Sequence, residues 1–386
     1  MIEPFSISIN DEVLVDLHDR LVRTRWPDEI GNNWQYGTDL TYLRSLCDYW
    51  HKDFDWRVQE AELNTFDHYR TEIAGKRLHF IHQRSTHVNA IPLLMTHGWP
   101  GSISEFVKIL PMLTQPERFG ADPADAFHVV CPSIPGYGFS AAPDQPGFDQ
   151  SQVARGHIEL MQRLGYERYG VQGGDWGSAI STWNAALAPD QVIGLHLNLV
   201  FAGMPKHKKD PFAGVSEEER SRLEARRLAV AEGTGYQAIQ GTKPQTLGYG
   251  LNDSPAGLAG WITEKFYSWT DSHGDLESCV SRDELLTNIM IYWVTGTATS
   301  AARLYYESKH SDQSGMYGDG RIATPTGYAM FPGELYQPPR VWVEELYNVV
   351  HWTAPAAGGH FAALEQPALL ADDVRKFFRS LRRSYS

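Results

Sequence analysis

The sequence has little of what marks secreted or nucleic-acid-binding proteins. Its 386 residues include three scattered cysteines, Cys47, Cys131 and Cys279, and no C-x-x-C pair, which excludes a disulfide framework. Basic residues are outnumbered 34 to 47, the formal net charge is −13 and no long basic run occurs. We therefore expect no nucleic-acid partner.

Long apolar runs are missing as well. No uninterrupted apolar stretch approaches the roughly 18 residues of a membrane-spanning helix. The first residues, Met1-Ile2-Glu3-Pro4, contain an acid and a proline instead of the basic region that opens a signal peptide. These absences predict a cytoplasmic protein in a reducing compartment, with no membrane partner.

What is present fits a folded, aromatic-rich enzyme. Hydrophobic residues make up 42% of the chain, aromatic residues 12% and charged residues 21%, a balance far from that of disordered proteins. The length suffices for one large or two medium domains with a sizeable core. No group of His, Cys, Asp and Glu has metal-ligand spacing and no phosphate loop occurs, so we expect no metal and no cofactor.

The first 88 residues read as an extension that precedes the main domain. Apolar residues recur at helical spacing over 13–22 and 40–54, and the second pattern continues over 56–63. Apolar and polar residues then alternate over 70–82 around a Gly75-Lys76 turn. This alternation predicts a β-hairpin.

The pattern changes at residue 91 to short apolar runs separated by helical stretches. The runs cover residues 91–95, 127–131, 168–171, 192–200 and 349–353. Such runs favour a mostly parallel sheet with helices on both faces. The rhythm breaks after residue 200, where charged helical segments such as 216–232 predict an inserted helical lid. The expected division is an extension over 1–88, a core over 89–200 and 315–386, and a lid over 201–314.

A candidate nucleophile lies where one of these strands meets a helix. The segment Gly173-Gly174-Asp175-Trp176-Gly177 has the layout of a nucleophile elbow, in which glycines two before and two after the nucleophile relieve crowding in a sharp turn. The serine version, Gly-x-Ser-x-Gly, occurs nowhere, which disfavours serine esterase chemistry. The alternative is that Asp175 is an ordinary helix N-cap.

A second glycine turn, His97-Gly98-Trp99-Pro100-Gly101, follows the run 91–95. Hydrolases of this layout place there the loop that supplies one backbone N–H to an oxyanion hole. A tight connection without function is the alternative. A further Gly/Pro turn, Pro135-Gly136-Tyr137-Gly138, follows the next strand and favours a functional loop.

A candidate base and its acid partner lie near the C-terminus. His360 stands on a glycine loop after the run 349–353, late in the order of nucleophile, acid and histidine. Glu334 follows a predicted strand end and is placed to orient the histidine ring. Glu344 and Glu345 are rival acids, but they belong to a helical pattern over 341–347, where a solvated face is the simpler account.

With these motifs in one order, the sequence resembles the epoxide hydrolases, most closely their microsomal-type branch, which implies an α/β-hydrolase fold. The resemblance spans nearly the whole chain and departs from mammalian members in lacking their N-terminal membrane anchor. The matching motifs are Arg23-Thr24-Arg25-Trp26-Pro27, His97-Gly98-Trp99-Pro100-Gly101-Ser102, Gly173-Gly174-Asp175-Trp176-Gly177, Leu251-Asn252-Asp253-Ser254-Pro255, Tyr292-Trp293 and Gly358-Gly359-His360-Phe361-Ala362.

The resemblance implies a catalytic triad and a two-step reaction. Asp175 attacks an epoxide carbon to form an ester, and His360, oriented by Glu334, then activates water to release a vicinal diol. Backbone N–H groups of Trp99 and Trp176 form the oxyanion hole. Epoxide and water are the expected partners, and the N-terminal segment leaves a homodimer open.

The resemblance also implies two lid tyrosines that hold the epoxide oxygen. Tyr236 is the first and Tyr305 the second, although the neighbouring Tyr306 leaves that choice open. A phenol suits the task because it stays protonated at neutral pH yet can donate to an alkoxide.

Two other functions remain as alternatives. Haloalkane dehalogenases share the fold and the aspartate nucleophile, but a halide needs no proton and so gives the lid tyrosines no task. A catalytically inactive binding module would have lost part of the site, whereas all its positions are filled here. Aromatic residues around the motifs predict an aromatic or bulky apolar epoxide. Bacterial relatives in polyketide and enediyne antibiotic biosynthesis imply a natural-product intermediate, and detoxification stays open.

Overall fold

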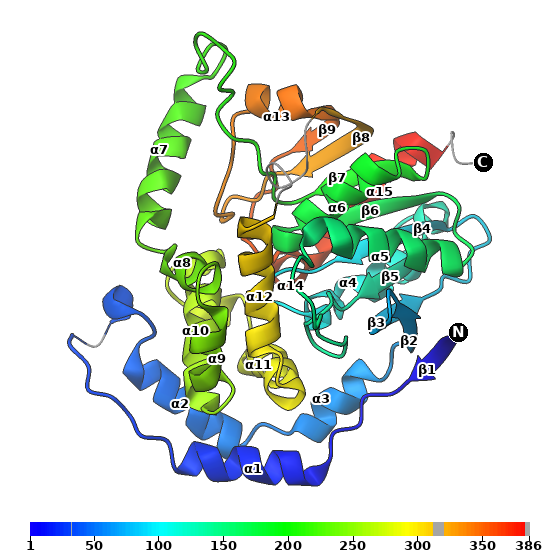
Figure 1. Ribbon diagram of the computed structural model, residues 1–386. Coiled ribbons are helices and arrows are strands. Elements are labelled where there is room, and N and C mark those ends of the chain that lie inside the picture. The colour runs from blue at the N-terminus through cyan, green and yellow to red at the C-terminus, as the bar shows by residue number, and fades with distance from the viewer. Residues whose placement is uncertain (32, 312–319, 383–386) are drawn as a thin grey trace.

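The computed structural model describes residues 1–386 except 32, 312–319 and 383–386. Within them, helices cover both faces of a nine-stranded sheet of order β1-β2-β3-β5-β4-β6-β7-β8-β9 (Figure 1). The first three strand pairings, β1–β2, β2–β3 and β3–β5, are antiparallel, and all others are parallel. The strands are β1 (Ile2–Phe5), β2 (His68–Ile73), β3 (Lys76–Gln83), β4 (Ile91–Thr96), β5 (Phe127–Pro132), β6 (Tyr169–Gly173), β7 (Val192–Leu197), β8 (Ile322–Ala329) and β9 (Tyr347–Thr353).

This architecture confirms the predicted α/β-hydrolase fold and all five apolar runs as strands. The run 192–200 extends beyond its strand, which ends at Leu197. Two strands, β1 and β8, were not predicted individually. The strand β8 reads Ile-Ala-Thr-Pro-Thr-Gly-Tyr-Ala, and its proline and glycine hide the strand pattern although the strand is paired on both sides.

The N-terminal extension packs against the lid. Its helices α1 (Asp11–Val22), α2 (Leu40–Lys52) and α3 (Trp56–Leu63) agree with the predicted patterns and lie along the bottom of the view in Figure 1. Arg20 Nη1 contacts Asp253 Oδ1 at 2.8 Å, and Thr38 Oγ1 donates to the Gly260 carbonyl at 2.7 Å. The extension is therefore fastened to the lid by polar contacts as well as by packing.

The predicted hairpin is also confirmed. β2 and β3 pair from His68 opposite Ile81 to Ile73 opposite Lys76. The turn residues are Ala74 and Gly75, one position earlier than predicted, with φ of 50° and 73°. Two consecutive left-handed residues form the turn that matches the twist of a two-residue hairpin.

The inserted segment between β7 and β8 is helical. Figure 1 shows α7 at the left of the molecule and the other lid helices stacked between it, the sheet and the N-terminal helices. The lid helices are α7 (Glu217–Ala231), α8 (Gly235–Gln240), α9 (Pro244–Leu251), α10 (Pro255–Trp269), α11 (Arg282–Thr295) and α12 (Ala298–Lys309).

The remaining helices cover the sheet. α5 packs on α6 on one face, and α15 packs on α4 on the other. They are α4 (Ile109–Thr114), α5 (Gln150–Arg163), α6 (Asp175–Leu187), α13 (Arg340–Leu346), α14 (Ala362–Glu365) and α15 (Pro367–Leu381). Short 3-10 helices cover Trp34–Tyr36, Ile103–Phe106, Pro116–Phe119, Pro123–Asp125 and Leu276–Ser278.

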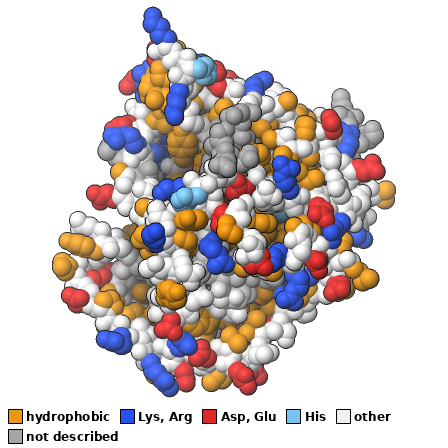
Figure 2. Space-filling view, viewed as in Figure 1, with side chains coloured by type: hydrophobic (Ala, Val, Ile, Leu, Met, Phe, Trp, Pro, Cys, Tyr) orange, Lys and Arg blue, Asp and Glu red, His pale blue; other side chains and the backbone are white. Residues whose placement is uncertain are grey.

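The surface is mixed in charge. Figure 2 shows Lys and Arg side chains interspersed with Asp and Glu over the visible face, without a large patch of one sign. Among the helices of the described residues, none combines the length and the apolar character needed to cross a bilayer.

Candidate active site

The turn between β6 and α6 puts Asp175 in a strained backbone conformation. Its φ is 48°, a left-handed value that an aspartate adopts at an energetic cost. The predicted role of the flanking glycines is visible here. A Cβ added to Gly173 would lie 2.2 Å from the Gly177 carbonyl oxygen, and one added to Gly177 would lie 1.9 Å from that of Thr96. The glycines thus let the turn close and expose the carboxylate.

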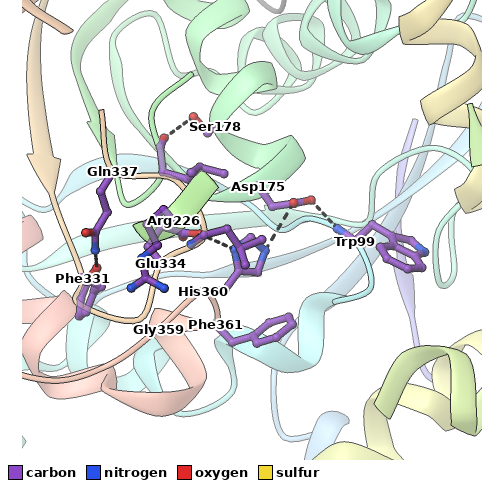
Figure 3. A network of polar contacts seen from close by, with 12 residues as sticks. Trp99, Asp175, Ser178, Arg226, Phe331, Glu334, Gln337, Gly359, His360 and Phe361 are labelled. Atoms are coloured by element: carbon purple, nitrogen blue, oxygen red, sulfur yellow. Dashed lines mark hydrogen bonds and ion pairs between the residues drawn. The ribbon is translucent and has the colours of Figure 1, made fainter. Parts of the chain in front are cut away.

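The loops that follow the carboxyl ends of β6, β8 and β9 bring Asp175, Glu334 and His360 together, as Figure 3 shows. His360 Nδ1 lies 2.8 Å from Glu334 Oε1, and Nε2 lies 3.4 Å from Asp175 Oδ2. The backbone N–H of Leu335 also donates to Glu334 Oε1, at 2.6 Å. Glu334 is fully buried, so its carboxylate is fixed behind the imidazole ring. The ring in turn faces Asp175.

Charge fixes the protonation of His360. Burial lowers its pKa, but the neighbouring carboxylates of Glu334 and Asp175 outweigh burial and hold the pKa well above its usual value. In the resting site the imidazole is therefore protonated at neutral pH and bonded to both acids.

Backbone donors lie around the Asp175 carboxylate. The Trp99 N–H donates to Asp175 Oδ1 at 2.7 Å, which brings the predicted His97–Gly101 loop to the site. Trp176 is the second residue of α6, where a helix leaves backbone N–H groups without an intrahelical acceptor and the helix dipole favours negative charge. Both predicted oxyanion-hole residues thus flank the carboxylate.

The lid places both predicted tyrosines in an aromatic cluster beside the site. The ring of Tyr236 stacks on Trp99 with centroids 4.9 Å apart, and Tyr305 meets Trp176 edge-on at 4.8 Å. The two tyrosine rings are 5.7 Å apart. Burial, and then the Asp175 charge, raise the pKa of Tyr236, and burial raises that of Tyr305 as well. Both phenols therefore remain protonated.

The structure resolves the tyrosine doublet. Tyr306 is 37% exposed and stacks on His310 at 4.0 Å, whereas Tyr305 contacts both Tyr236 and Trp176. The helix α12 carries consecutive residues to different faces, so only Tyr305 belongs to the cluster.

The rival acids lie elsewhere. Glu344 pairs with Arg340 at 2.7 Å within α13, and Glu345 pairs with Lys208. Both occupy the helical surface that the sequence pattern indicates, and Glu334 alone of the three contacts His360.

Glu105 is a site residue that the sequence reasoning missed. Burial raises the pKa of its carboxyl to about 8. With Asp175 and His360 it lines a cavity of about 20 Å³, enough for one water molecule. A Cβ on Gly101 would lie 1.5 Å from Glu105 Oε1, so the glycine in the loop is what admits this side chain. The sequence offered one signal: Glu105 follows Ser102 by three residues, a spacing that marks the start of a helix and not a catalytic site.

Glu365 was also missed. Its carboxylate accepts hydrogen bonds from the backbone N–H groups of Gly359 and Phe361, each at 3.0 Å, on either side of His360. A third bond, 2.8 Å long, comes from the backbone N–H of Asp271, two residues after the lid helix α10 ends. Burial raises the pKa of Glu365 to about 7. This carboxylate holds the histidine loop and joins it to the lid.

Comparison with known proteins identifies the family. A family model described as "Epoxide hydrolase N terminus" matches residues 2–106, and one for the "alpha/beta hydrolase fold" matches residues 91–224. Epoxide hydrolase 1 of Sus scrofa is 42% identical over 97% of this chain and 88% of its own length. The chain belongs to the epoxide hydrolase family. The resemblance inferred from the motifs is confirmed.

Solved structures of epoxide hydrolases agree with the assignment of this chain to the family. The juvenile hormone epoxide hydrolase of the silkworm Bombyx mori superposes with a TM-score of 0.91 at 33% identity, covering 100% of this chain and 96% of that one. The Aspergillus niger epoxide hydrolase gives a TM-score of 0.87 at 32% identity, covering 99% and 97%. The protein is thus an enzyme that hydrolyses small-molecule epoxides. This assignment takes the place of the two alternatives, a haloalkane dehalogenase and an inactive binding module.

Proposed function

We propose that this epoxide hydrolase works through a covalent ester on Asp175. The observation that carries the proposal is the placement of the Asp175 carboxylate, on a backbone with φ of 48°, between the Trp99 N–H and the His360 imidazole. An Asp175 oxygen attacks an epoxide carbon, the bond from that carbon to the epoxide oxygen breaks, and the electron pair stays on the oxygen. The product of this step is a glycol monoester of the enzyme.

The lid tyrosines supply the proton for this step. An alkoxide is a poor leaving group, and it needs a donor that is still protonated at neutral pH. Tyr236 and Tyr305 meet this condition, because burial raises the pKa of both phenols. Their rings meet edge-to-face with centroids 5.7 Å apart, so the two phenols belong to one aromatic cluster. One phenol transfers its proton while the other stabilises the oxygen by a hydrogen bond.

Formation of the ester prepares His360 for the second step. Esterification removes the negative charge of Asp175, one of the two charges that hold the His360 pKa high. The pKa therefore falls, and the imidazole gives up its proton, which restores the phenol that protonated the alkoxide. The neutral ring can then accept a proton from water. Glu334 keeps the ring oriented throughout.

Hydrolysis then occurs at the Asp175 carbonyl carbon. The cavity bounded by Asp175, His360 and Glu105 has room for the attacking water. The oxyanion that forms lies near the backbone N–H groups of Trp99 and Trp176, a stabilisation worth about 3–4 kcal/mol per donor in other hydrolases. Collapse of the intermediate restores the Asp175 carboxylate and releases the diol, so that one water is consumed per epoxide.

A single turnover in oxygen-18 water tests the ester. Enzyme in excess over styrene oxide would be allowed one turnover, and the diol and the peptide containing Asp175 analysed by mass spectrometry. Because water attacks the aspartyl carbon, the label should enter Asp175 and the diol should receive an unlabelled enzyme oxygen. Label in the diol but not in the peptide would indicate direct attack by water and overturn the proposal. Enzyme incubated without substrate is the control for background exchange.

We further propose that the substrate is an aromatic or bulky apolar epoxide. Support comes from the indole and phenol rings next to Asp175, which include Trp99, Trp176, Tyr236, Trp269 and Tyr305. Such a lining favours apolar ligands over small polar ones. A kcat/KM for styrene oxide no higher than that for glycidol would contradict this. A natural-product intermediate and a foreign epoxide both meet the description.

A further inference from the structure

A second hollow of the molecule lies away from the catalytic residues. It is a groove of about 540 Å³ between the β2–β3 hairpin, the loop 138–142 after β5, the start of α9 and the junction of α11 with α12. Its volume lies in the range of small-molecule sites, which is roughly 300–1,000 Å³. Neither Asp175, Glu334 nor His360 lines it.

Three arginines line this groove, and its lining contains no carboxylate. Arg70 comes from β2, Arg77 from β3 and Arg303 from α12. Within the described residues, no Asp or Glu lies within ion-pair distance of any of the three, whereas half of the other described arginines have such a partner. Three like charges therefore converge without a counter-charge from the protein.

Three acids that lie close in sequence to residues of the lining are bonded elsewhere. Asp144 pairs with Lys76, and Asp253 pairs with Arg20. Glu307, one turn after Arg303 on α12, accepts the backbone N–H of Gly147 at 2.7 Å. Each of these carboxylates has a donor of its own, and none of the three forms an ion pair with an arginine of the groove.

Glu72 is the remaining acid of the hairpin. It lies opposite Arg77 in the strand register, but its side chain is exposed and makes no ion pair with Arg77. The strand register would allow an ion pair between Glu72 and Arg77, but the two side chains do not form one.

One of the three arginines is fixed in place. The guanidinium carbon of Arg70 lies 3.6 Å from the ring centroid of Phe5, and Nη2 donates to the Phe139 carbonyl at 3.3 Å. Burial, and then the charge of Arg77, lower the pKa of Arg70, which places the two cations close together. A guanidinium held on an aromatic face loses little further freedom when it binds an anion.

Neutral donors complete the lining. Thr297 and Thr299 stand at the start of α12, whose N-terminal N–H groups add partial positive charge, and Gln245 and Asn252 belong to the same lining. Thr299 Oγ1 donates to Asn252 Oδ1, and Asn252 Nδ2 donates to the Gly296 carbonyl, each at 3.2 Å. Hydroxyls, amides and arginines are the groups that bind phosphate and carboxylate oxygens in proteins.

We propose that this groove binds a small organic anion with at least two negative charges, carried by phosphate or carboxylate groups. Such a ligand would bridge the hairpin and the lid, because Arg70 and Arg77 belong to the one and Arg303 to the other. The lid side of the bridge shares a helix with the active site, since Arg303 lies on α12 two residues before Tyr305. Tyr137 and Ser300 fasten the same helix to the loop after β5, through bonds to the carbonyls of Ala301 and Gly136.

Calorimetric titration of the intact enzyme with sodium pyrophosphate and with citrate tests the proposal. The titrations use low ionic strength, and matched sodium chloride serves as the reference for non-specific screening. Saturable binding of one anion per chain is expected, and the anion that binds more tightly shows whether phosphate or carboxylate is preferred. No saturable binding of either anion overturns the proposal.

Variants localise the binding. Arg77→Gln and Arg303→Gln remove charge at an exposed and a half-buried position, so the fold should survive, and each should weaken binding about tenfold or more. Arg118→Gln is the matched control, an exposed arginine outside the groove with one side-chain hydrogen bond, to Gln115. Equal affinity in both groove variants and the control contradicts the assignment. Should either groove variant fail to fold, Arg77→Lys, which keeps the charge but not the planar fork, replaces it and should also weaken binding.

Discussion

At the scale of single residues, the site is a balance of charges around one histidine. His360 lies between two carboxylates, and its protonation depends on whether Asp175 carries a charge. The same imidazole can therefore be a cation in the resting enzyme and a base in the ester. No second base is needed for the two half-reactions.

This dependence predicts the effect of Asp175→Asn. The amide has the shape of the carboxylate but, like the ester, no charge, so the His360 pKa should fall by at least one unit, roughly the effect of losing one close opposite charge. An NMR titration of the imidazole measures the shift, with Asp253→Asn, a surface change, as the control. An unchanged His360 pKa would contradict the two-charge account.

The tyrosine doublet gives a matched pair of variants. Tyr305→Phe removes a proton donor from the aromatic cluster and should slow ester formation about 10²-fold or more, as loss of a general acid does. Tyr306→Phe changes an exposed ring on the adjacent position and should leave kcat near that of the natural enzyme. Stopped-flow kinetics with styrene oxide would measure the step. Equal loss in both variants would reject Tyr305 as the donor.

At the scale of structural elements, the loop that carries His360 is held by a side chain further along the chain. Glu365 accepts hydrogen bonds from three backbone N–H groups. In Glu365→Gln an NH₂ group replaces one carboxylate oxygen, so a donor faces a backbone donor and at least one of these bonds is lost. Glu365→Gln should therefore lower kcat about tenfold, with KM little changed, because a buried unpaired donor costs about 1–3 kcal/mol.

The control for Glu365→Gln is Glu344→Gln, which alters an exposed ion pair of α13. Steady-state kinetics and thermal unfolding are measured for both. A purely structural role of Glu365 would lower the melting temperature and leave kcat of the folded enzyme intact, which would refute its action on His360.

Elements and motifs were predictable from the sequence to different degrees. Strands β4 to β7, the hairpin and the elbow at Asp175 follow from local patterns, because apolar runs and glycines act over a few residues. Glu105 and Glu365 were not predictable, since their roles depend on contacts across loops that sequence spacing does not reveal. The choice of Tyr305 over Tyr306 likewise required the orientation of α12.

At the scale of the whole molecule, buried histidines connect stability to pH. Burial lowers the pKa of His82 and His97 to about 4 and that of His157 to about 3, and holds that of His79 well below its usual value. The unfolded chain takes up these protons below about pH 6.5. Folded-state pKa values are depressed, so the stability that these histidines contribute is complete above pH 6.5 and is lost on acidification.

Two buried carboxyls act in the opposite direction. Glu105 and Glu365 have raised pKa values, about 8 and about 7, so near pH 6 the folded chain holds two protons that the unfolded chain lacks. Four histidine protons outweigh these two. The free energy of unfolding should therefore fall from pH 6 to pH 5, since each proton that the unfolded chain binds in excess contributes about 1.4 kcal/mol per pH unit.

Urea unfolding at a series of pH values measures this slope. Neither ring nitrogen of His157 has a hydrogen-bond partner among the described residues, so phenylalanine can replace the ring. His157→Phe should reduce the slope by about one proton. A stability that rises from pH 6 to pH 5 would contradict the prediction.

The sequence order of the site has a consequence for how the protein is made. The nucleophile, at residue 175, leaves the ribosome long before the acid at 334 and the base at 360, and the entire lid is synthesised between them. A nascent chain that has completed the elbow but not the segment with Glu334 and His360 has no base to hydrolyse an ester on Asp175. Turnover therefore begins only when the last strand of the sheet, β9, and its following loop have docked, because this loop carries His360.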